Sequence, residues 1–155
     1  MISAEYRSIV VDKFPERAPE IINRQIDEVV KFLSIISSHQ GRFIPLTQDA
    51  DEVWHEMIVQ TRHYMEFCNA LPGSRYIHHE SIGMEEYADK IGKNAAIAQF
   101  LSWVPDYLQT YGPFTSETAE DWAVVQFLVH EMNMELADVN SLGRSSSDKS
   151  QPPVV

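Results

Sequence analysis

The chain has 155 residues, of which 44% are hydrophobic, and its formal net charge is −11. This length suffices for one domain, which would bury about two thirds of the surface of its unfolded chain. The excess of acidic side chains disfavours nucleic acid as a ligand, because affinity for phosphate backbones comes largely from Lys and Arg. Charged residues interrupt every apolar run before it reaches the roughly 20 residues of a membrane-spanning helix, so we expect no membrane segment.

The cysteine content and the first residues indicate a cellular compartment. The sequence contains one cysteine, Cys68, which excludes an intramolecular disulfide and is typical of a reducing environment. Its start, MISAEYRSIVVDKF, does not have the long apolar segment of a secretory signal. We therefore expect a cytoplasmic protein.

A first amphipathic helix is predicted between Pro15 and Ser38. Pro15 and Pro19 suit the first turn of a helix, where the missing N–H costs no hydrogen bond. The apolar residues of this stretch recur at steps of three and four positions, which places them on one face: Ile22, Ile26, Val29, Leu33 and Ile36.

A second helix is predicted from Thr47 or Asp49 to about Ala70, where a Pro-Gly pair ends it. At about 100° per residue, one stripe of this helix is centred on Trp54 and should face the core. Its other members are Met57, Ile58, Thr61, Met65 and Cys68. His63 lies opposite this stripe, so we expect it to be solvated.

Helix is again predicted over residues 84–111, with a break or kink near Gly92 and another near Pro105. Thr115 or Ser116 would then cap a last helix. The apolar residues of that helix form one stripe, which consists of Trp122, Val125, Val129, Met132 and Leu136.

The last predicted helix ends at about Val139. Residues 140–155 are rich in Ser and Pro and poor in apolar side chains, so we expect a disordered tail or linker there. The sequence therefore predicts one all-α domain over residues 1–139. We expect a compact bundle of about four to five helices, with a short extended segment around residues 73–80.

The chemistry of the chain is concentrated in residues 49–80, which hold four of its six histidines and its cysteine. Asp51 precedes His55 by four residues, so the carboxylate and the imidazole share one helix face. Such a pair can bind a metal together, or the carboxylate can orient the imidazole. Cys68 lies thirteen residues beyond His55, too far along a continuous helix to share its ion, and it is predicted to be a small buried side chain.

His78 and His79 follow the Pro-Gly turn, and their reach decides whether either can meet His55. Seven extended residues cover about 23 Å, which is close to the length of helix that they must retrace. Contact is therefore expected only if the returning segment is nearly straight. Neighbouring residues of an extended segment point to opposite sides, so one of the two histidines should face any single site.

Three interpretations of these residues remain open at this point. The histidines can be structural imidazoles, hydrogen-bonded to Asp51, to a carbonyl group or to each other. They can form a site for metal-free proton transfer. They can instead bind a divalent metal, zinc or iron, for which the candidate ligands are Asp51, His55, His78 and His79.

Three stretches of the chain resemble the glycine-rich domain-containing protein-like family, in its small bacterial type without the glycine-rich tail. They are FIPLTQDADEVWHEMIVQTRHYMEFC, RYIHHE and YLQTYGPFTSETAEDW. The resemblance covers about residues 28–125, and its most specific positions are Asp51, Trp54, His55, Tyr64, Cys68, His78 and His79. The family usually has a second histidine two residues after the first, where this chain has Met57. The resemblance implies a helical domain without an established activity.

Two classes of function follow from the sequence. In the first, the domain binds a divalent metal for structure or for chemistry on a partner. In the second, it is an acidic adaptor that binds another protein without a metal, and its histidines are structural. An enzyme is the third choice, because the sequence does not fix a nucleophile and a base at a catalytic spacing.

Overall fold

The structure, a computed structural model, describes residues 2–39, 44–80 and 84–150. Its regular elements in these ranges are helices, so the prediction of an all-α protein is confirmed. The described residues form α-helices α1 to α9 and one short 3-10 helix, η1. The helices are therefore more numerous than the four to five expected. None of the helices in these ranges has both the length and the apolar composition needed to cross a membrane.

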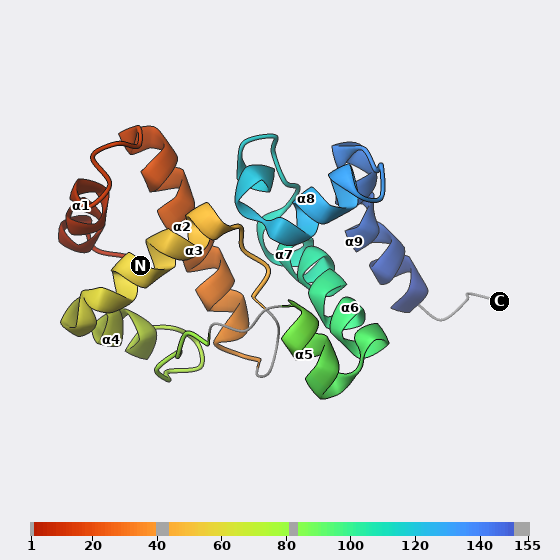
Figure 1. Cartoon of the computed structure of the whole chain (residues 1–155), viewed down its shortest axis with the longest axis horizontal. Coiled ribbons are helices and arrows are strands. Elements are labelled where there is room, and N and C mark those ends of the chain that lie inside the picture. Colours follow the sequence, from red (N-terminus) through yellow and green to blue (C-terminus); the bar gives the residue numbers. More distant parts are fainter. Residues whose placement is uncertain (1, 40–43, 81–83, 151–155) are drawn as a thin grey trace. The chain divides into compact units, whose positions relative to one another are not determined.

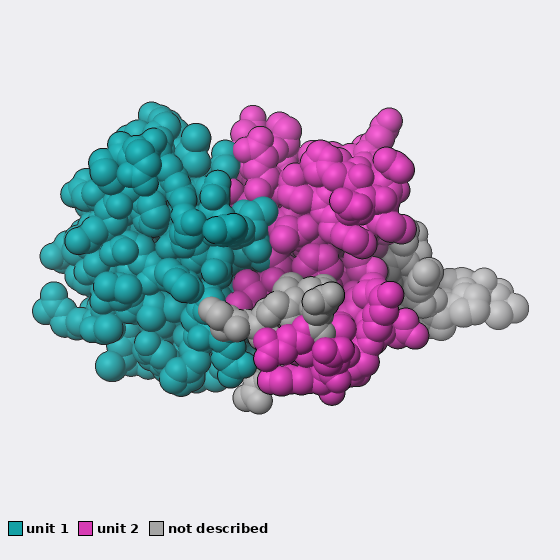
Figure 2. Space-filling model, viewed as in Figure 1, with its two compact units in different colours: residues 1–42, 46–83 teal, residues 43–45, 84–155 magenta. Residues whose placement is uncertain are grey.

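The chain divides into two compact units (Figure 2). Unit 1 comprises residues 1–42 and 46–83, and unit 2 comprises residues 43–45 and 84–155. The single domain expected over residues 1–139 stays a prediction. Each unit has its own buried side chains.

Unit 1 is built around α2 (Pro19–Ile36), and α3 (Gln48–Val59) packs across it (Figure 1). The two other helices of the unit are α1 (Ala4–Asp12) and α4 (Thr61–Asn69). Pro19 occupies the first turn of α2, as predicted, whereas Pro15 lies in the turn before the helix begins. The predicted apolar face of α2 is confirmed, because all five of its residues are buried: Ile22, Ile26, Val29, Leu33 and Ile36.

The second predicted helix is interrupted at Gln60, whose ψ of 67° is not helical. The interruption turns a different face of α4 toward the core than a continuous helix would. Tyr64 and Cys68 are buried, whereas Met65 is 54% exposed and Thr61 is also exposed. The predicted inward stripe is therefore confirmed for Trp54, Met57 and Cys68, while Ile58 is half-buried. It is wrong for Thr61 and Met65, which follow the break.

His63 on α4 is half-buried, and its ring stacks on Tyr6 of α1 at a centroid separation of 5.1 Å. The expectation that His63 is solvated is therefore only partly met. The Tyr6 hydroxyl donates a hydrogen bond of 2.6 Å to the Met57 carbonyl, which ties α1 to α3.

Unit 2 has a helix break near each of the two positions where the sequence predicted one. Gly92 separates its first two helices with a φ of 93°, a left-handed conformation that favours glycine. The next break falls at Ser102 rather than at Pro105, which lies in the first turn of the following helix. The elements are α5 (Met84–Ile91), α6 (Lys93–Leu101), α7 (Trp103–Tyr111), η1 (Thr118–Asp121), α8 (Ala123–His130) and α9 (Leu136–Ser150).

Aromatic rings fill the centre of unit 2. Tyr107 stacks on Phe114 at a centroid separation of 3.9 Å and meets the edge of Trp122 at 5.1 Å. Trp122 in turn lies against Trp103, at 6.2 Å. All four side chains are buried, so they form an apolar core for the helices of this unit.

The last helix predicted by the sequence is divided into η1, α8 and α9, and Met132, expected inside, is 59% exposed between α8 and α9. α9 also continues beyond Val139, where the sequence placed the end of the folded domain. The Asn140 side chain accepts a hydrogen bond from the Phe114 N–H at 2.8 Å and donates one to the Phe114 carbonyl at 3.0 Å. Residue 140 thus takes part in the packing of unit 2.

Candidate metal centre

The candidate site begins on α3, where Asp51 lies in the first turn and His55 lies one turn later. Both side chains are accessible, with 30% of Asp51 and 55% of His55 exposed. The nearest approach of Asp51 Oδ2 to His55 Nε2 is 3.8 Å, which is too long for a hydrogen bond. The predicted pair therefore shares a helix face without the carboxylate orienting this imidazole directly.

The segment that follows α4 is anchored first at the end of α2. A Cβ added to Gly73 would lie 2.0 Å from the Ser37 carbonyl oxygen, so only glycine permits this close approach. Arg75 then donates hydrogen bonds to the carbonyls of Ile36 and His39, at 2.8 and 2.6 Å. The Ile36 carbonyl belongs to the last turn of α2, where a helix leaves acceptors without helical partners and favours a cation, and His39 lies three residues beyond that turn.

The next anchor of the segment is Ile77, whose side chain is buried. The Tyr64 hydroxyl donates a hydrogen bond of 2.6 Å to the Ile77 carbonyl and accepts one of 3.1 Å from Trp54 Nε1. Burial raises the pKa of Tyr64, which keeps the hydroxyl protonated as the donor that this carbonyl requires. Tyr64 and Trp54 thereby hold a segment without regular secondary structure against α3 and α4.

His79 completes the cluster, with 9% of its side chain exposed. Its Nε2 atom lies 2.7 Å from Asp51 Oδ1 and 3.0 Å from His55 Nε2. The His79 ring also packs on the Trp54 ring, with 4.3 Å between their centroids. The segment therefore returns far enough to bring an imidazole to His55, as the estimate of reach required.

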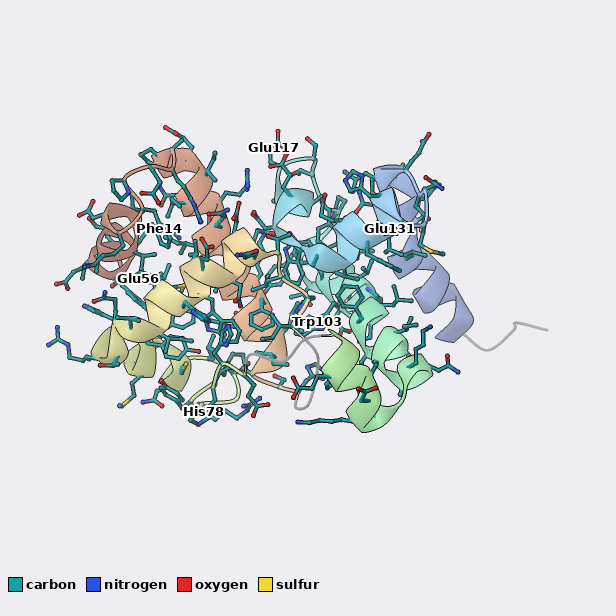
Figure 3. All side chains as sticks on the ribbon, in the orientation of Figure 1. Phe14, Glu56, His78, Trp103, Glu117 and Glu131 are labelled. Atoms are coloured by element: carbon teal, nitrogen blue, oxygen red, sulfur yellow. The ribbon has the colours of Figure 1, made fainter. Side chains whose placement is uncertain are left out.

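His78 points elsewhere, as the alternation of an extended segment predicts for one of two adjacent residues. It is exposed, and its ring lies against Tyr76 at a centroid separation of 4.8 Å (Figure 3). The anchored residues of the segment lie two positions apart and are Gly73, Arg75, Ile77 and His79. Of the four candidate ligands, the structure brings together Asp51, His55 and His79 and leaves His78 outside.

Positive charge from the loop before α2 offsets part of the acidic surface at the start of α3. The Arg17 guanidinium forms an ion pair with Glu52, lies 3.8 Å from the Asp49 carboxylate and donates to the Asp49 carbonyl at 3.2 Å. Asp51 is the acidic residue of this turn whose carboxylate meets the imidazoles. Asp49 and Glu52 are therefore engaged by Arg17, and Asp51 is left to contact His79.

The ligand atoms of Asp51, His55 and His79 all lie within 4.8 Å of one another. Two atoms bound to one zinc ion at about 2.0–2.1 Å are about 3.0 Å apart at a right angle and about 3.4 Å apart at a tetrahedral angle. The separations of 2.7 and 3.0 Å around His79 are close to the first of these values. Two imidazoles and one carboxylate are donors that suit zinc or iron better than magnesium or calcium.

Sequence reasoning missed the positioning role of Tyr64, although it placed Trp54 in the core. A tyrosine on a helix face beside the predicted return segment was the available signal, since buried tyrosine hydroxyls usually find a partner. Met57, which occupies the position where the resemblance expects a second histidine, is fully buried. It therefore lies in the core of unit 1 and takes no part in the cluster.

A family model described as UCP032817-like matches residues 1–106 of the chain, which include all three residues of the cluster. Comparison with curated proteins and with solved structures finds no match. The resemblance to the glycine-rich domain-containing family is not tested by these comparisons and stays a prediction.

Proposed function

The chain belongs to the UCP032817-like family, and we propose that it functions as a divalent metal-binding domain whose ligands are Asp51, His55 and His79. The ion is of the zinc or iron(II) type. By binding α3 and the returning segment together, it fixes the stretch of unit 1 between α4 and residue 80, which has no helix of its own.

The observation that carries this proposal is the double contact of His79 Nε2 with Asp51 and His55. A ring nitrogen has either one proton or one lone pair in the ring plane. A proton there suits Asp51 at 2.7 Å but can reach His55 at 3.0 Å only through a bent, shared bond. A lone pair on His79 Nε2 can accept a proton from His55, but it then faces the negatively charged Asp51 carboxylate and is repelled by it. A cation accepts lone pairs from all three groups at once.

Metal analysis of protein purified without an affinity tag, followed by zinc titration by calorimetry, tests the proposal. We expect one equivalent of metal in the wild type. His55→Ala, His79→Ala and Asp51→Asn should each bind zinc at least tenfold more weakly, since even outer-shell changes cost about 10–100-fold. His78→Ala is the matched control, because it removes the adjacent histidine outside the cluster and should leave the affinity unchanged.

Thermal unfolding gives a second measure of the same binding. Zinc at 100 times its dissociation constant should stabilise the wild type and His78→Ala by about 2.7 kcal/mol, because it binds the folded state alone. His79→Ala should gain much less. Metal content far below one equivalent, or equal zinc affinity in His79→Ala and His78→Ala, would remove the proposal.

The net charge of −11 favours a second candidate, an acidic adaptor that binds a basic partner protein without a metal. In that case a specific partner should be captured by the wild type and by His79→Ala alike. Its capture should weaken between 50 and 300 mM salt, since screening reduces contacts between exposed charges. Capture that depends on His79 and on added zinc would instead support the metal-dependent function.

A further inference from the structure

The three candidate ligands differ in their exposure, and this sets which side of a bound ion faces solvent. His79 lies deepest and is covered by Trp54, Asp51 is intermediate, and His55 is more than half exposed. An ion bound by all three therefore has His79 beneath it and its remaining coordination positions on the side of His55. Those positions open toward water.

Protein side chains do not close that side within the described part of the chain. No fourth His, Cys, Asp or Glu among the described residues joins the group. The acidic neighbours on α3 are engaged elsewhere, since Glu52 pairs with Arg17 and Glu56 accepts a hydrogen bond of 3.1 Å from Gln60. Structural zinc sites are almost always closed by four protein ligands, whereas sites with three keep a position for water or substrate.

The charge and the angles of the site indicate what would fill those positions. A divalent ion with one carboxylate and two neutral imidazoles keeps a net charge of +1, which favours an anion. The separations of 2.7 and 3.0 Å around His79 are those of neighbouring positions on an ion. The third separation, 3.8 Å between the Asp51 carboxylate and His55, corresponds to a wider angle. In any arrangement of three protein ligands on a six-coordinate ion, at least two of the open positions are neighbours. A chelating anion can then occupy two of them.

We propose that an ion held by Asp51, His55 and His79 binds a small organic acid through its carboxylate and an adjacent oxygen. The proposal rests on the metal-binding function above and goes beyond it, because a purely structural ion would have no exchangeable positions. The ligand class comprises 2-hydroxy and 2-oxo acids, whose two oxygens form a five-membered ring with a metal. Simple monocarboxylates bind the same ion through one group and therefore more weakly.

Cobalt(II) provides the test, because its visible absorption reports the number and type of its ligands. The full chain is loaded with one equivalent of Co²⁺ and titrated with glycolate, a chelating 2-hydroxy acid, and with acetate, which has the same charge without the hydroxyl. We expect glycolate to change the spectrum with an affinity at least about tenfold higher than acetate, because its second donor is held beside the first. His78→Ala should behave as the wild type.

The outcomes separate this proposal from the one on which it rests. Far-UV circular dichroism first verifies that His55→Ala, which changes an exposed side chain, has the fold of the wild type. If Co²⁺ then gives the same spectrum with the wild type and with His55→Ala, metal binding by the cluster is refuted. If the spectrum depends on His55 but glycolate leaves it unchanged, the ion is closed to ligands and only the present inference is overturned. Equal responses to glycolate and acetate would overturn the chelating mode. Metal content measured after each titration verifies that glycolate has not removed the ion.

Discussion

The two units use aromatic side chains for different purposes. In unit 2, Tyr107, Phe114 and Trp122 pack against one another at the centre of the helices. In unit 1, Trp54 and Tyr64 also hold the backbone of a segment that has no helix, and Trp54 covers the imidazole of its last anchor. Ring packing alone thus suffices to stabilise a bundle, whereas the polar atoms of aromatic residues can position a site.

The largest effect on stability is expected from Trp122→Ala in unit 2. Removing this fully buried ring should lower the free energy of unfolding by about 3–5 kcal/mol, measured by denaturant titration. Zinc affinity, measured by calorimetry at a temperature where the variant is folded, should stay at the wild-type value. An affinity as low as that of His79→Ala would show that the site depends on the core of unit 2.

Gly73→Ala should disturb unit 1 and the site together. Its Cβ would overlap the Ser37 carbonyl, and displacing the segment should cost about 1–3 kcal/mol and weaken zinc binding. Gly92→Ala in unit 2 is the matched control. Its Cβ meets no atom within 4 Å, although its positive φ makes any side chain strained. It should lose stability without losing zinc affinity, and the reverse pattern would contradict the role given to Gly73.

Tyr64→Phe keeps the ring and removes the hydroxyl that links Trp54 to the Ile77 carbonyl. Leaving these buried groups without that partner should cost about 1–3 kcal/mol of unfolding free energy. Zinc affinity should fall about tenfold, since outer-shell partners orient metal ligands. Tyr76→Phe, on the segment itself, should change stability by no more than about 0.5 kcal/mol. Equal effects of the two variants would show that the hydroxyl of Tyr64 has no positioning role.

At alkaline pH the wild-type chain itself should lose stability, by a gradual effect that is small near pH 10. Burial raises the pKa of Tyr6 and of Tyr64 in the folded state, whereas tyrosine in an unfolded chain ionises near pH 10. Because the pKa of each of these tyrosines is higher in the folded state, the unfolded chain ionises first. The stability that follows from this difference is fully present below pH 10 and is lost as the pH rises above it. Each phenol should lower the free energy of unfolding by about 1.4 kcal/mol per pH unit in that range.

Denaturant titrations between pH 9 and 11 measure this loss, and the ultraviolet absorption of tyrosinate reports ionisation. Tyr6→Phe should flatten the pH dependence of stability in unit 1. A slope that is the same in this variant as in the wild type would contradict the assignment to Tyr6.

Much of the helical structure could be predicted, because the apolar face of α2 and the break at Gly92 each have a local signal. The break at Gln60 could not, since neither glycine nor proline marks it. There, packing of Tyr64 and Cys68 into the core outweighs helix continuity, and Met65 is left outside. Local propensity is a weak prior that tertiary packing overrides.

For the candidate site, the sequence predicted that one of the two histidines on the return segment would face any single site, and that contact with His55 required a nearly straight return. It could not predict which one. Which histidine meets His55 depends on where the segment first contacts the end of α2. The contacts there are the close approach of Gly73 to Ser37 and the hydrogen bonds of Arg75. These contacts join residues about 36 positions apart, and no local pattern encodes them.

The two-residue spacing of the anchors from Gly73 to His79 has a consequence for change in this stretch. Inserting a single amino acid between Arg75 and His78 would move His78 into the position that His79 now occupies, four residues after Arg75, and present the other imidazole to Asp51. A deletion would instead bring Glu80 to that position. Tandem histidines therefore tolerate an insertion that would abolish a site built on one, and the position that matters is counted from Arg75.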